Sequence, residues 1–361
     1  MNKFKKIGLT ALAGSLVTMG SATAGEMSVS GSIAVTLGYG NLSGNSSRAI
    51  GTDRDVSFTG GGELDNGTTF SMNTTLDDDY AVSGSTTTIN TPSFGSFYFG
   101  TGHGLQSGKY DEEVPQAYEQ ISDAKQTMAN LVGNYMDGNA ISYTSPTFDV
   151  MGASITVDAG YAPTAADSAE NDGSNDAFNA TYGEGSELGV RIAYDALQLG
   201  VYGSERKTSI PNTNTTTGQE IGDEFNGAWY VKYSMGPVSI GYSETYMDAS
   251  VTQANEATTA SKTERTAGGI FTGEQLSIAF NVNDNMSISY TTSDETYDTQ
   301  DNAATATTDD DDITESVDAL QIAYSMGGMS VKAYNMEVTN PNQDDNAADA
   351  SITEIALGFA F

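Results

Sequence analysis

The chain has 361 residues, with 48 acidic against 14 basic side chains and a formal net charge of −34 at pH 7. A surface this acidic repels nucleic acid and favours cations, so nucleic-acid binding is excluded as a function. Cysteine is absent, so the fold cannot rely on disulfides.

Residues 1–24 have the pattern of a secretory signal peptide. A basic start precedes an apolar stretch from Ile7 to Met19, and residues 22–24 form the small-x-small pattern that signal peptidase cleaves. The sequence therefore predicts export, followed by a mature domain of residues 25–361. No later apolar run approaches the roughly 20 residues that a membrane-spanning helix needs.

From residue 27 onward, apolar residues recur at every second position in short segments. This is the period of a β-strand with one apolar and one polar face. The first such segment has Val29, Ile33, Val35, Leu37 and Tyr39 on one face. The pattern returns through 188–201, 229–242, 276–290 and 320–324, and the final segment carries it to Phe359 and Phe361. It predicts an all-β, antiparallel protein.

The connections between these segments alternate between short and long. Short connections rich in Gly, Asn and Pro predict hairpin turns at 64–67, 145–148, 234–237, 283–285 and 325–328. Long acidic connections, at 162–185, 208–224, 250–264, 298–314 and 340–350, predict solvated loops at the other end of the strands. The count of segments predicts about sixteen strands of about ten residues each.

Sixteen strands in an open sheet would expose unpaired edges, so we expect the sheet to close into a barrel. A barrel this wide cannot be filled by its own side chains, so its interior is expected to be aqueous and its apolar face to meet a lipid bilayer. Phe359 and Phe361 then lie on the closing strand, with the last aromatic residue at the membrane interface.

The signal peptide, the stretch "GSIAVTLGYG" at 31–40, the hairpin rhythm and the final "GFAF" resemble Gram-negative outer-membrane general porins, in particular the alphaproteobacterial sixteen-stranded type. The resemblance implies a 16-stranded antiparallel transmembrane β-barrel, with a constriction loop folded into the lumen. It also implies passive diffusion of small hydrophilic solutes and ions through a homotrimer. In that family the outer-membrane barrel assembly machinery reads the terminal phenylalanine, which Phe361 matches.

One connection, residues 102–138, is far longer than the others. Loops of this length are usually functional or disordered, and this one carries aromatic and aliphatic residues at near-helical spacing that need a surface to pack on. The resemblance identifies it as the constriction loop. It implies that the acidic side of the constriction is formed by Asp111, Glu112, Glu113, Glu119 and Asp123. A loop that caps the mouth of the barrel is the alternative.

The opposing basic side of the pore is expected to be thin. Strand parity turns Arg191 and Lys232 into the lumen, and Lys332 and Arg54 complete the expected set. Few bases predict a weak transverse field and a preference for cations. In the alternative interpretation, Arg191 and Lys232 are simply solvated in a wide lumen.

Two other functions fit the same pattern. A substrate-specific channel, for example for a sugar, could use Tyr98, Tyr202 and Tyr230, which face inward by parity. A secreted, soluble all-β adhesin would use the same alternation with its apolar faces turned inward.

Small outward residues, such as Gly31, Gly152 and Ala153, suit the packing of barrel against barrel and so favour the trimer.

The sequence predicts no enzyme and no cofactor. His103 is the single histidine, so neither a histidine metal triad nor a Ser-His-Asp arrangement can be formed. The carboxylates of Asp309, Asp310, Asp311 and Asp312 could bind a structural Ca²⁺ ion. A solvated run of charge is the favoured interpretation of that stretch.

Overall fold

The computed structural model describes residues 26–42, 45–78, 81–101, 106–121, 140–163, 165, 182–208, 223–248, 270–298 and 312–361. The predicted signal peptide, Asp123 and Asp309 to Asp311 lie outside these ranges. None of the helices within the ranges has the length and apolarity needed to cross a membrane.

The described residues form one antiparallel sheet of seventeen strands. Its strands are β1 (Glu26–Leu42), β2 (Asn45–Glu63), β3 (Thr69–Leu76), β4 (Val82–Thr91), β5 (Gly95–Thr101), β6 (Ala140–Thr144), β7 (Phe148–Val150), β8 (Ala153–Ala162), β9 (Tyr182–Tyr194), β10 (Leu197–Thr208), β11 (Glu224–Met235), β12 (Val238–Asp248), β13 (Ile270–Asn283), β14 (Met286–Asp298), β15 (Ile313–Met326), β16 (Met329–Thr339) and β17 (Ala350–Ala360). Two 3₁₀ turns accompany them, η1 (Ser107–Lys109) and η4 (Pro341–Gln343).

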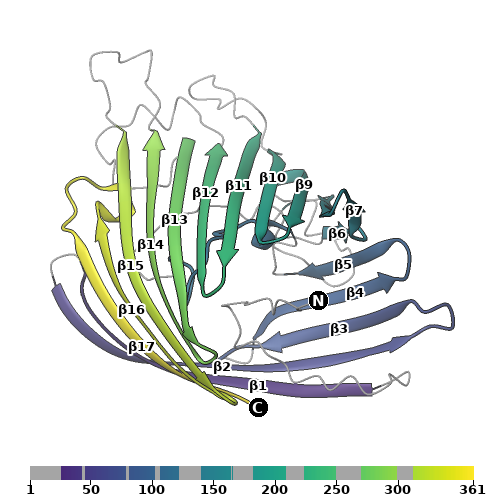
Figure 1. Ribbon diagram of the computed structural model, residues 1–361, viewed down its shortest axis with the longest axis horizontal. Helices are drawn as coiled ribbons and strands as arrows, with labels where there is room; N and C mark the ends of the chain where they lie inside the picture. Colours follow the sequence, from purple (N-terminus) through teal and green to yellow (C-terminus); the bar gives the residue numbers. More distant parts are fainter. Residues whose placement is uncertain are drawn as a thin grey trace.

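The sheet closes on itself. β17 pairs with β1 from Ser32 opposite Ala360 to Asn41 opposite Ser351, so the first and last strands lie side by side (Figure 1). Closure pairs the two strands that would otherwise form the open edges of the sheet. The predicted barrel is confirmed.

β6 and β7 together occupy a single strand position in the barrel, because both pair with β8. Between them lies Pro146, which has no backbone N–H to donate to the ladder. Ser145 bridges the break, since its N–H donates to the Val157 carbonyl at 2.8 Å and its Oγ accepts from the Val157 N–H at 2.9 Å. The seventeen strands therefore occupy sixteen strand positions in the barrel, as predicted. The hairpin turn predicted at 145–148 is wrong. The chain turns instead at Met151–Gly152.

The predicted turns that contain glycine or asparagine have the expected geometry elsewhere. Gly67, Gly236 and Gly327 have φ angles of 79°, 59° and 61°, in the region that glycine adopts without strain. At the 283–285 turn, the Asn283 side chain accepts from the Asn285 N–H at 2.9 Å.

Apolar residues face out of the barrel and polar residues face in. On β13, Leu276, Ile278 and Phe280 are 49, 48 and 40% exposed, whereas the alternating Gln275 and Ser277 are each 1% exposed. Residues opposite each other on neighbouring strands share a face, and Ile278 lies opposite Ile240 and Tyr290, which are also exposed. This orientation is the reverse of that expected for a soluble adhesin.

Toward the long connections, the outward face changes from apolar to acidic. Glu244, Glu274 and Asp294 lie directly opposite one another on β12, β13 and β14. Neighbouring aromatic side chains donate to them: Trp229, directly opposite Glu244 on β11, places its Nε1 3.0 Å from that carboxylate, and Tyr242 Oη lies 3.1 Å from Glu274. We call this row of Glu244, Glu274 and Asp294 the acidic collar.

The last residue of the chain sits on the first strand. Phe361 exchanges two backbone hydrogen bonds with Gly31, of 2.8 and 3.0 Å. A Cβ on Gly31 would lie 2.8 Å from the Phe361 ring. The Phe361 ring therefore covers Gly31, so this glycine does not offer a free small surface for packing against another barrel.

Candidate functional site: the lumen segment

Residues 106–121, here called the lumen segment, leave the barrel wall after β5 and run along its inner face. Their partners belong in turn to β8, β11, β13, β14, β15 and β17. We call the inner faces of β5 to β17 the loop-bearing wall, and those of β1 to β4 the open wall. The described part of the predicted 102–138 loop thus lies within the barrel.

The lumen segment begins at a buried carboxylate, Asp158 of β8. Arg191 binds it through two nitrogens, at 2.7 and 3.1 Å, and Lys109 Nζ lies 3.0 Å away. Tyr110 Oη and Thr144 Oγ1 also donate to it, at 2.8 and 2.7 Å. The fully buried charge is thus neutralised and its oxygens are satisfied, which is the condition for keeping an ionised group inside a protein. Lys109 and Tyr110 are fixed to the wall as a result.

Three tyrosines pack together behind this anchor. The Tyr110 ring stacks on Tyr202 at 4.9 Å and lies 6.3 Å from Tyr230. Burial, with Asp158 nearby, raises the pKa of Tyr110 well above its ordinary value, so its hydroxyl stays a donor. Tyr202 and Tyr230 are each only 4% exposed. These two rings are therefore covered by the lumen segment and are not open to solutes, whereas Tyr98, the third ring of the set, is half-buried.

The predicted acidic residues occupy different environments. Glu112 is 4% exposed and points into the wall, where it accepts from Gln275 Nε2 at 2.6 Å and from the Ile121 N–H at 3.1 Å. Its predicted place on the pore surface is wrong, because these bonds use the carboxylate to brace the segment. Glu113 forms an ion pair with Lys232. Asp111 and Glu119 are half-buried.

The middle of the lumen segment is held mainly through its backbone. Ser277 Oγ donates to the Pro115 carbonyl at 2.6 Å, and the Ala117 N–H donates to Ser289 Oγ at 2.8 Å. Gln321 accepts from the Tyr118 N–H at 2.7 Å and donates to the Glu119 carbonyl at 2.8 Å. Side chains of β13 to β15 thus fix the path of the chain whatever side chains the segment carries.

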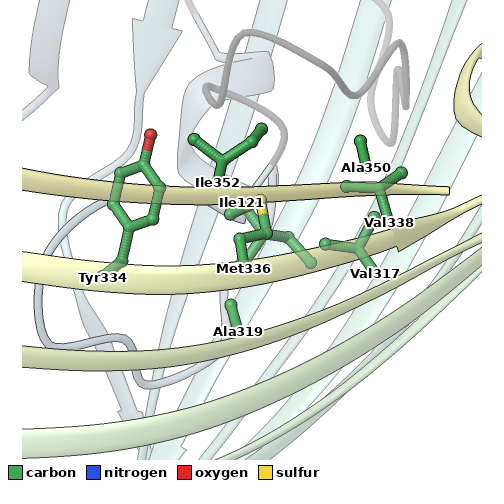
Figure 2. Packing of buried hydrophobic residues seen from close by; sticks show 8 residues of the cluster. All are labelled: Ile121, Val317, Ala319, Tyr334, Met336, Val338, Ala350 and Ile352. Carbon is green, nitrogen blue, oxygen red and sulfur yellow. The ribbon is translucent and has the colours of Figure 1, made fainter. Parts of the chain in front are cut away.

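The described part of the segment ends on an apolar cluster. Ile121 packs with residues from β15, β16 and β17 (Figure 2): Val317, Ala319, Tyr334, Met336, Val338, Ala350 and Ile352. Beside it, Tyr118 Oη donates to Glu354 at 2.7 Å, and Lys332 Nζ lies 5.1 Å from the Tyr118 ring centroid. Burial, with the hydrogen bond to Glu354, holds the pKa of Tyr118 well above its ordinary value, so this hydroxyl also stays a donor.

The predicted basic residues do not form a wall opposite the lumen segment. Arg191, Lys232 and Lys332 face inward but stand on the loop-bearing wall, in contact with Asp158, Glu113 and Tyr118 respectively.

The predicted place of Arg54 in the pore wall is wrong. Arg54 lies opposite Ile33, which faces outward, so Arg54 faces outward too and pairs with Asp78 at 2.9 Å. Its parity is that of Val56 and Phe58 on the same strand.

Comparison with known proteins agrees with this architecture. The family model described as Gram-negative porin matches residues 8–210. The chain belongs to the Gram-negative porin family. It is accordingly a non-enzymatic outer-membrane protein for passive diffusion.

Solved structures similar to this porin share its fold at low identity. OmpT of Vibrio cholerae is 15% identical, with a TM-score of 0.63, over 95% of this chain and 99% of that one. OmpF of Salmonella typhi is 12% identical, with a TM-score of 0.64, over 94 and 98%. An anion-selective porin from Comamonas acidovorans is 13% identical, with a TM-score of 0.61, over 93 and 100%. No curated protein matches the chain.

The open wall of this porin is neutral or acidic. Its inward residues are mostly hydroxyls and amides, among them Ser57 bonded to Thr75 at 2.8 Å and Asn73 bonded to Thr59 at 3.2 Å. The inward charges on the described part of β1 to β4 include Asp53, Asp55 and Glu63, and no base of this part faces the lumen.

Sequence reasoning missed Asp158, the residue that anchors the lumen segment. It is the single charged residue in "ASITVDAGYA" of β8, turned inward by parity, and that isolation was the available signal. Gln321 and Glu354 gave no comparable signal, because their role depends on a segment more than 200 residues away in the sequence.

Proposed function

We propose that this porin is a homotrimeric channel that prefers cations and is narrowed by the 102–138 loop. The observation that carries the proposal is the placement of charge in the lumen. The inward bases of the described strands, Arg191, Arg206, Lys232 and Lys332, stand in contact with Asp158, Glu224, Glu113 and Tyr118. The described part of the open wall adds the carboxylates of Asp53, Asp55 and Glu63 and no base.

Bases paired with carboxylates, as Arg191, Arg206 and Lys232 are, hold anions weakly, whereas carboxylates that line the lumen attract cations. Asp111 and Glu119 of the lumen segment, and Asp53 and Asp55 of the open wall, would form the acidic lining of the narrow region. The similar porin from Comamonas acidovorans is anion-selective. The sign of selectivity must therefore come from side chains rather than from the fold.

Further features of the proposal rest on resemblance and, for export, on the residue pattern of the N-terminus. The trimer is supported by the trimer form of OmpT from Vibrio cholerae, which is 14% identical and has a TM-score of 0.57. The alphaproteobacterial type rests on the stretches "GSIAVTLGYG" and "GFAF". Export through a signal peptide ending at Ala24, and recognition of Phe361 by the barrel assembly machinery, complete the route to the membrane. The mass of the mature protein, expected to begin at Gly25, tests the cleavage.

Planar-bilayer recording of the detergent-purified protein under a KCl gradient tests the function. We expect large conductance steps in groups of three and a reversal potential on the cation side. Small steps that one solute blocks would replace the general pore with a substrate-specific channel. A reversal potential on the anion side would overturn the cation preference. Conductance steps that never come in groups of three would overturn the trimer.

A further inference from the structure

Glycines line the path of the first half of the lumen segment. Gly189 of β9 and Gly241 of β12 face inward, because they lie opposite the inward residues Asp158 and Lys232. Glycine weakens a strand interior, and its presence there often marks a place where another part of the chain approaches closely.

The space above both glycines is occupied by the lumen segment. A Cβ on Gly241 would lie 2.5 Å from Pro115 Cδ and 3.1 Å from Val114 Cα. A Cβ on Gly189 would lie 2.7 Å from Cε2 of Tyr110, and closer still to the ring's Cζ and Oη. By contrast, Gly38 faces inward on the open wall, opposite Glu354, and a Cβ there would meet nothing within 4 Å.

The segment cannot slide sideways to relieve such a contact. The Pro115 carbonyl is bound by Ser277 at 2.6 Å, and the Tyr110 hydroxyl by Asp158 at 2.8 Å. An added methyl group would therefore displace the segment away from the wall, which means toward the lumen. Close-packed contacts transmit such a displacement instead of absorbing it.

We propose that Gly189 and Gly241 are positioning residues that set the width of the channel, by letting the lumen segment lie directly against the barrel wall. This inference rests on the proposed function, in which the segment narrows the pore. It assigns the pore width to wall residues that contact no solute.

Single-channel conductance of G241A and G189A tests the proposal, with G38A as the matched control. All three variants add one methyl group to an inward strand position, and alanine forms strands no less well than glycine. We expect G241A and G189A to form trimers as heat-resistant as wild type but to conduct less, while G38A conducts like wild type. P115A removes the nearest clashing atoms, so G241A/P115A should regain the conductance that G241A loses.

The possible failures are distinguishable. If G241A and G189A conduct like G38A, the positioning role is overturned while the porin function stands. If wild type itself forms no channel, the proposed function fails first. If G241A does not assemble, restored assembly and conductance in G241A/P115A support the contact. Failure of the double variant together with wild-type conductance of G189A overturns the inference.

Discussion

Glu113 of the lumen segment and Lys232 of β11 form an ion pair that spans 119 residues of sequence and joins the segment to the barrel wall. Both side chains are partly exposed to the lumen, at 29 and 23%. Each charge is therefore close enough to passing ions to affect selectivity, and each cancels the other. Their balance gives a sharp test of how the lumen selects ions.

We expect K232Q and E113Q to shift the reversal potential in opposite directions. K232Q leaves the Glu113 carboxylate uncompensated and should increase cation preference, whereas E113Q leaves the Lys232 ammonium and should reduce it. Reversal potentials in a KCl gradient measure both. The double variant removes both charges and should return close to wild type. A shift of the same sign in both single variants would show that the pair does not act through its charge.

Arg54 provides the complementary test, because the structure places it outside the pore. R54Q should leave the reversal potential unchanged. Its exposed pair with Asp78, with side chains 56 and 41% exposed, should contribute no more than about 1 kcal/mol to stability. The same KCl gradient measures the first expectation, with K232Q as the positive control. A clear change in selectivity in R54Q would place this side chain in the lumen after all.

The sequence predicted the barrel well because its strongest signal is local. Alternation of apolar and polar residues along each strand determines which face meets lipid, and Ile278 or Phe359 can be assigned from their immediate neighbours. The same rule would have turned Arg54 outward if the parity of Val56 and Phe58 had been extended two residues back. The error at 145–148 arose because Pro146 marks a turn in most contexts, whereas here it only interrupts the pairing of β6 and β7 with β8.

The site was predicted less well because it depends on contacts between distant residues. Whether Glu112 lines the pore or braces the segment is decided by Gln275, 163 residues away. Likewise, parity predicts that Lys232 faces inward. Only the path of the lumen segment determines that Lys232 lies beside Glu113 and not across the pore from it. No local pattern contains that information.

Among single substitutions on the loop-bearing wall, we expect a change at Asp158 to lower the stability of the barrel most. D158N leaves Arg191 and Lys109 without their counter-ion. The cost should lie at the low end of the about 3–5 kcal/mol typical of broken buried pairs, since these two side chains keep 33 and 29% exposure. We expect a lower midpoint for heat-induced unfolding on gels and a noisier open-channel current. D149N, an exposed aspartate bonded to Ser154, is the control. Destabilisation with an unchanged current would contradict the anchoring role.

Phe361 should contribute to barrel closure through its ring. F361A keeps the backbone bonds to Gly31 but loses the ring that covers it, so we expect a smaller fraction of heat-modifiable, folded protein after refolding into detergent. Refolding without cells separates closure from recognition by the assembly machinery. F94A removes an equally exposed phenylalanine at a turn, 72% against 75%, and should refold like wild type. Equal yields for both variants would show that the ring does not aid closure.

The acidic collar should make stability depend on salt. Glu274 stands between Glu244 and Asp294 on neighbouring strands, and like charges directly opposite each other destabilise a strand pair. E274Q removes both repulsions while its amide oxygen can still accept from Tyr242. We expect E274Q to unfold at a higher temperature than wild type in neutral detergent at low ionic strength. The difference should shrink as NaCl is raised, because salt screens exposed charges. A difference that does not change with salt would mean that the substitution acts through packing rather than through charge.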